Sequence, residues 1–103
     1  MNNKILALLG FASKAGKLSY GMNKTDEALK KDVSRLVIVA CDTSDKSKKE
    51  VIFSANKSGI EGIVLQDCTA EQLSHAVGRS CSVISVNDIG FAEAIREIGN
   101  TTH

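Results

Sequence analysis

The sequence of 103 residues contains no proline, no internal repeat and no low-complexity segment. Nothing in it resembles a linker, so we expect residues 1–103 to form a single domain with a modest core. No apolar run approaches the roughly 20 residues that cross a bilayer. The apolar stretch after Lys4 meets Ser13 and Lys14 too soon for a signal peptide. These features predict a cytoplasmic protein that does not contact a membrane.

Cysteine and histidine are also scarce. The cysteines Cys41, Cys68 and Cys81 lie far apart, without the close spacing of a zinc site, and their odd number argues against a disulfide framework. His75 falls in a helical pattern and His103 is the last residue, so neither has a second ligand nearby. We therefore expect no metal and no cofactor.

Groups that could perform catalysis are few. A catalytic site needs a nucleophile with a base, paired carboxylates or a metal cluster. The sequence offers only Asp42 and Asp45, with Ser44 between them. These residue types are common at helix N-termini, where their oxygens accept bonds from free backbone N–H groups. We interpret them as helix caps and do not expect an enzyme.

The net charge of the chain is small, but its charged residues are unevenly distributed along the sequence. The net charge is only +1, yet residues 1–50 hold ten basic and six acidic residues, whereas residues 51–103 hold three basic and six acidic residues. Four lysines precede Asp26, which is the first acidic residue. Such asymmetry is typical of a protein with one basic face, which would favour an anionic partner.

The hydrophobic pattern alternates between helices and strands. The unbroken run at 36–40 is rich in β-branched residues and predicts a central strand covered on both faces. Thr69 and Gln72 have the spacing of a capping box, and Gly78 can end the helix that they begin. The pattern predicts a three-layer α/β/α sandwich with a small mixed sheet. Its expected helices span about 3–15, 24–31, 44–57, 69–78 and 87–98, and its strands 36–40, 60–65 and 83–86.

The stretch from Ser13 to Lys31 is the most informative. Gly16 can close the first helix, Gly21 allows a close backbone approach, and Asn23 is expected to cap the second helix, with Asp26 in its first turn. A helix N-terminus among lysines attracts anions, although solvated surface charge is the alternative interpretation. We expect one positive surface beside Gly21, formed by Lys14, Lys17, Lys24 and Arg79.

Five segments in the same order carry a resemblance to a known family. The chain resembles the small bacterial YlxQ-like proteins of the kink-turn-binding ribosomal-protein superfamily. The resemblance covers essentially the whole chain. Its segments are Gly10–Leu18, Gly21-x-Asn23, Val39–Asp42, Leu73-x-x-Ala76-x-Gly78 and Asp88-x-Gly90-Phe91-Ala92.

This resemblance implies an α/β/α fold and a non-catalytic RNA-binding function. Members of the superfamily bind RNA at sharp kinks flanked by sheared G·A pairs, which Asn and backbone N–H groups can contact. The implied partner is structured RNA, such as ribosomal RNA or a messenger leader, bound by a monomer associated with the ribosome or the transcription machinery. The implied RNA-binding residues are Lys14, Lys17, Gly21, Met22, Asn23, Lys24, Glu27, Arg79 and Ser80.

Two departures from the family pattern leave an alternative open. Lys24 stands where kink-turn binders commonly carry Glu, and Glu27 stands where they often have Lys. Their spacing permits a salt bridge, but Lys cannot accept bonds from guanine as Glu can. The loop after Gly78 carries polar Arg79 and Ser80 in place of apolar residues. The alternative is a protein-interaction module of the transcription or translation machinery with weakened RNA specificity.

Overall fold

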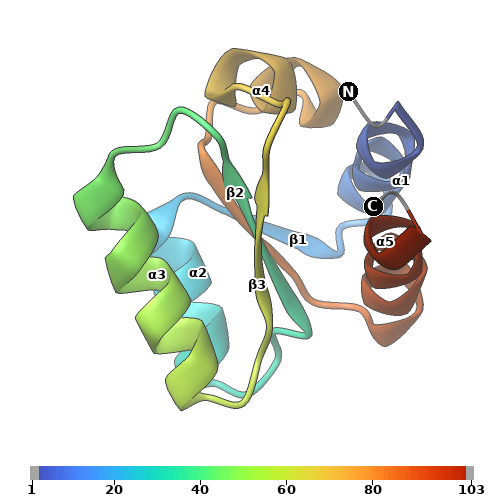
Figure 1. Cartoon of the computed structure of the whole chain (residues 1–103). Coiled ribbons are helices and arrows are strands. Elements are labelled where there is room, and N and C mark those ends of the chain that lie inside the picture. Colours follow the sequence, from blue (N-terminus) through green and yellow to red (C-terminus); the bar gives the residue numbers. More distant parts are fainter. Residues whose placement is uncertain (1–2, 102–103) are drawn as a thin grey trace.

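The computed structural model describes residues 3–101, and the side chains of residues 4–98 (Figure 1). Helices and strands alternate along the chain. The helices are α1 (Asn3–Lys14), α2 (Met22–Lys30), α3 (Asp45–Lys57), α4 (Ala70–Val77) and α5 (Ile89–Thr101). The strands are β1 (Leu18–Tyr20), β2 (Leu36–Ala40), β3 (Gly62–Leu65) and β4 (Val83–Val86).

The four strands form one mixed sheet in the order β1-β4-β2-β3. β4 pairs antiparallel with both β1 and β2, whereas β2 and β3 run parallel. β2 is therefore an inner strand, and all five of its residues are buried. This confirms the prediction from its unbroken apolar run, since a strand covered on both faces needs apolar side chains on both.

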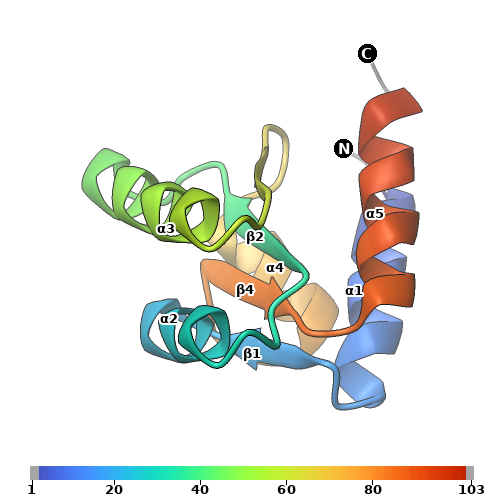
Figure 2. The same cartoon turned by 90° about the horizontal axis from the view of Figure 1, so that it is seen from below.

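Helices cover both faces of the sheet (Figures 1 and 2). α1, α4 and α5 pack on one face, and α2 and α3 pack on the other, which confirms the expected sandwich. In β2 the side chains of Leu36, Ile38 and Ala40 enter the first core, whereas Val37 and Val39 enter the second. α1 and α5 lie side by side in both views. Among the described residues, no helix has the length and apolarity needed to span a membrane.

Several helix ends follow the signals in the sequence. Ser44 Oγ accepts a hydrogen bond from the N–H of Ser47 at the start of α3, at 3.2 Å. The Thr69–Gln72 capping box is formed at the start of α4, and Gly78 ends that helix in the left-handed conformation. Asp42 Oδ1 accepts a 2.8 Å bond from Ala70 N, so it caps α4 rather than the neighbouring α3. The interpretation of Asp42 and Ser44 as capping groups is confirmed.

Two expectations about the stretch from Ser13 to Lys31 are wrong. α2 begins at Met22 with Gly21 as its N-cap, so Asn23 lies inside the helix and Asp26 lies beyond the first turn. The reason is backbone geometry: Gly21 leaves β1 in a conformation that places its carbonyl to accept from Thr25 N. The sequence also predicted no strand between the first two helices, where the structure has β1. This strand is too short to show an alternating pattern and depends on pairing with β4.

Candidate nucleic-acid interface

The N-terminus of α2 is open because Gly21 has no side chain to cap it. Gly21 N donates to Val83 O at 2.7 Å, which fixes the turn against β4. Its φ of 88° and ψ of 168° lie in a region that essentially only glycine adopts. Described side chains supply no cap in its place. The first intrahelical bond, from Thr25 N to Gly21 O, leaves the preceding N–H groups available to an anion.

The outer face of α2 carries alternating charges. Lys24 Nζ lies 3.7 Å from Glu27 Oε2, and Lys31 Nζ donates to Glu27 Oε1 at 2.7 Å. The salt bridge that the spacing of Lys24 and Glu27 permits is therefore formed. The hydrogen bond from Lys31, reinforced by the charge of Lys24, lowers the pKa of Glu27. All three side chains are largely exposed, so the lysines can exchange this partner for a phosphate at little cost.

Tyr20, which the sequence analysis did not single out, holds Arg79 beside the Gly21 turn. The guanidinium carbon of Arg79 lies 4.8 Å from the centre of the Tyr20 ring. The Tyr20 hydroxyl lies 2.5 Å from Ser13 Oγ, which also donates to Val77 O at 2.8 Å. These contacts join α1, β1 and the end of α4. The position of this single tyrosine, directly before Gly21, was the available sequence signal.

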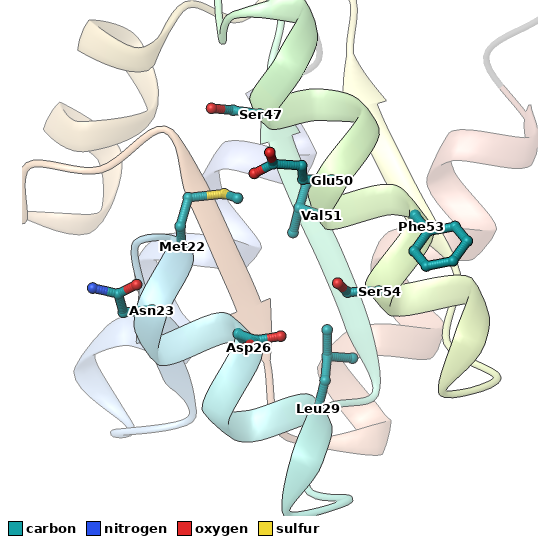
Figure 3. A pocket seen from close by; sticks show the side chains of 9 residues that line it. All are labelled: Met22, Asn23, Asp26, Leu29, Ser47, Glu50, Val51, Phe53 and Ser54. Carbon is teal, nitrogen blue, oxygen red and sulfur yellow. The ribbon is translucent and has the colours of Figure 1, made fainter.

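The structure brings the other expected RNA-binding residues together only in part. Lys14 ends α1 directly after Ser13, and exposed Ser80 follows Arg79. Lys17 lies at the opposite end of β1 from Gly21, where its carbonyl accepts from Asn87 N at 2.8 Å. Asn23 is exposed, whereas the half-buried Met22 extends towards α3 (Figure 3). Lys24 therefore lies on α2 next to the open helix end, and Arg79 lies on the ring of Tyr20, the residue before Gly21. Lys17 lies at the other end of β1.

The described residues offer little support for a metal site or for a reactive cysteine. Residues 3–101 contain no group of three or more His, Cys, Asp or Glu side chains that could hold a metal. Cys41, Cys68 and Cys81 are free thiols. Burial raises the pKa of both Cys68 and Cys81, which keeps these two thiols protonated near neutral pH.

Solved structures that are similar to this chain include two that superimpose on nearly all of it. A Bacillus halodurans protein of unknown function superimposes with a TM-score of 0.88 and 28% sequence identity, covering 94% of this chain and 97% of its own. The 15.5kD RNA binding protein of Giardia lamblia superimposes with a TM-score of 0.75 over 95% of this chain and 87% of its own. It is 18% identical, so it supports the fold alone.

Sequence comparison gives the same relationship. The chain is 29% identical over 96 residues to the RNA-binding protein YlxQ of Enterococcus faecium, covering 92% of this chain and 90% of that protein. The YlxQ-like resemblance seen in the sequence motifs is thereby confirmed. The model of the Ribosomal protein L7Ae/L30e/S12e/Gadd45 family matches residues 3–96. Because that match spans nearly the whole chain, this protein belongs to the L7Ae/L30e/S12e/Gadd45 family.

Proposed function

We propose that this protein is a non-catalytic RNA-binding protein that recognises structured, kinked RNA in the cytoplasm. The observation that carries the proposal is the uncapped N-terminus of α2 at Gly21, with Lys24 on the helix and Arg79 on the ring of the preceding Tyr20. Free N–H groups and two cations suit phosphates, and the exposed amide of Asn23 can bond base edges. The name of the YlxQ relative supports the same function.

The proposed RNA is a kinked internal loop of a ribosomal RNA or a messenger leader. A sheared G·A pair exposes guanine edges at a bend, where a helix end can approach two phosphate strands at once. One copy of the chain offers the complete helix end, so we propose that it binds as a monomer associated with translation.

A second candidate function follows from the Lys24–Glu27 pair. Glu27 binds both Lys24 and Lys31, so part of the positive charge of α2 is already neutralised within the helix. A protein-interaction module of the transcription or translation machinery could retain this fold while binding RNA weakly. The two functions differ in their dependence on salt and on RNA shape.

Titration of labelled RNAs over a salt series tests the proposal. One RNA carries a kinked internal loop with tandem G·A pairs, and its control is a straight duplex of equal length. We expect tighter binding to the kinked RNA, with log affinity falling by about 0.7–0.9 per decade of salt for each phosphate neutralised. Equal affinity for both RNAs would contradict recognition of the kink. Absence of salt-dependent RNA binding would favour the alternative function, the protein-interaction module.

A further inference from the structure

A groove of about 500 Å³ separates α2 from α3 on the face of the sheet away from α1 and α5 (Figure 3). The floor and walls are partly apolar. Met22 and Leu29 contribute from α2, and Val51 and Phe53 contribute from α3. Leu29 and Val51 are buried members of the second core, so the floor of the groove is held by packing against the sheet.

Phe53 is the most exposed of the large apolar side chains in the described structure, with 68% of its surface accessible. It borders this groove and also a second hollow of about 370 Å³ along α3. Unlike the α2–α3 groove, this second hollow is lined by two basic residues, Lys48 and Lys49, together with Ile52 and Asn56. The ring therefore stands on a ridge between two hollows. Aromatic rings are enriched at protein–protein interfaces, where they act as anchors that pack into pockets of the partner.

The charges lining the groove have a single sign. Its ionisable residues are Asp26 and Glu50, whose carboxylates are directed into the space between the helices in Figure 3. Asp26 Oδ2 lies 3.1 Å from Lys30 Nζ, outside the lining. Glu50 has no ion-pair partner among the described residues. These carboxylates disfavour a phosphate backbone and favour a cation.

We propose that the α2–α3 groove binds a segment of a partner protein that carries a bulky apolar side chain next to Lys or Arg. The apolar side chain would pack against Phe53 and Met22, and the cation would pair with Glu50. This proposal is independent of RNA binding, because it rests on the carboxylates and on Phe53. Met22 and Asn23 belong to both surfaces, so the partner would lie beside a nucleic acid bound at the helix end.

Site-specific photo-crosslinking in the cells that natively make the protein tests this inference. The full chain carries p-benzoylphenylalanine in place of Phe53, and its matched control carries the same group in place of Phe11. Phe11 has 61% of its surface exposed but belongs to α1, on the opposite face of the sheet. We expect a protein adduct at position 53 that position 11 does not give, with Lys or Arg in the crosslinked peptide.

Substitution of Glu50 then tests the role of charge. Glu50 is exposed, so both Glu50→Lys and Glu50→Gln should leave the melting temperature unchanged. We expect Glu50→Lys to lower the adduct yield by about fivefold, equivalent to roughly 1 kcal/mol, and Glu50→Gln to lower it less. RNA affinity should not fall in either variant. An adduct with RNA, with a second copy of the chain or with an acidic segment would overturn the inference, as would equal adducts at positions 53 and 11 or a yield insensitive to Glu50.

Discussion

Gly21 combines a requirement of the fold with a requirement of the proposed site. A Cβ built on Gly21 would meet no heavy atom within 4 Å, so the residue is needed for its backbone conformation and not for close packing. The same open space lies in front of the uncapped end of α2. A substitution here should therefore affect both stability and binding, and a matched glycine elsewhere can separate the two.

Gly59 supplies that match, because its φ is also positive at 75° and a Cβ there would also meet open space. We expect Gly21→Ala and Gly59→Ala each to lower the free energy of unfolding by about 1–3 kcal/mol, measured by denaturant titration. Only Gly21→Ala should lower the affinity for kinked RNA under conditions where both variants are folded. Equal RNA affinities in the two variants would assign Gly21 a structural role alone.

Lys24 separates phosphate binding from base recognition. Its ammonium is a flexible point charge without the planar fork that fits a guanine edge, so we expect it to bind phosphate. Lys24→Ala should weaken all structured RNAs alike and make the salt slope shallower by about one unit. A loss of roughly 1–3 kcal/mol confined to RNAs with one particular guanine would show base recognition instead. Lys24→Glu, which introduces the residue common in kink-turn binders, should sharpen the preference for the kinked RNA.

Tyr20 should act by positioning Arg79. Tyr20→Leu removes the ring below the guanidinium, and we expect RNA affinity to fall about two- to fivefold, the equivalent of a cation–π contact of about 0.5–1 kcal/mol. Tyr20→Phe keeps the ring and should lose less. In the Arg79→Ala background, Tyr20→Leu should have no further effect on RNA affinity. An unchanged effect of Tyr20→Leu in that background would show that the ring acts without Arg79.

At the scale of single elements, α2 combines an open N-terminus with a network of exposed ion pairs. Glu27 is its centre, since it pairs with Lys24 about one turn before it and with Lys31 about one turn after it. A carboxyl with a lowered folded-state pKa contributes stability above its unfolded pKa, and this contribution is lost as the pH falls through the folded pKa. Acidification should therefore release both lysines from Glu27.

An NMR pH titration of the Glu27 carboxyl checks this behaviour. We expect a midpoint below the ordinary value of 4.5. Lys31→Ala should raise the midpoint most, because the Lys31 hydrogen bond is the largest cause of the shift, and Lys24→Ala should raise it less. The exposed Lys30, which pairs with Asp26, is the control, and Lys30→Ala should leave the Glu27 midpoint nearly unchanged. A midpoint insensitive to Lys31 would mean that this ion pair does not persist in solution.

At the scale of the whole molecule, a buried chain of polar groups ties distant segments together. Ser85 Oγ on β4 lies 2.7 Å from Ser34 Oγ and 2.6 Å from Asn87 Oδ1, and Asn87 Nδ2 donates to Ser19 Oγ on β1 at 2.9 Å. Ser85 and Ser34 are almost fully buried. Ser85 and Ser34 depend on partners from other parts of the chain because water does not reach them, whereas Asn87 and Ser19 are half-buried.

Ser85→Ala should therefore destabilise the fold without affecting the RNA-binding surface. Loss of the hydroxyl leaves buried polar atoms of Ser34 and Asn87 without this partner, and we expect a decrease of about 1–3 kcal/mol in the free energy of unfolding. Ser58→Ala, at an exposed position after α3, should change it by less than about 0.5 kcal/mol. Denaturant unfolding and RNA titration together check both statements, and a neutral Ser85→Ala would show that the packing adapts.

The features that depend on neighbouring residues were predictable from the sequence by itself. The capping box at Thr69, the Ser44 cap, the turn at Gly78 and the inner strand β2 follow from side chains a few positions apart, or from an unbroken apolar run. The Lys24–Glu27 pair also follows, because residues three apart on a helix are neighbours. Local chemistry was sufficient for the layers and for the start of α2 to within two residues.

Tertiary structure alone decided the features that join distant segments. β1 exists because β4 lies beside it, and its three residues show no periodicity of their own. The sequence contains no signal that Arg79 would stand over Tyr20, or that Ser34 and Asn87 would both bond to Ser85. Such contacts form only when the sheet order brings the segments together. They placed Arg79 on the ring of Tyr20, the residue before Gly21, and they joined the Lys17 carbonyl to Asn87 N at the other end of β1.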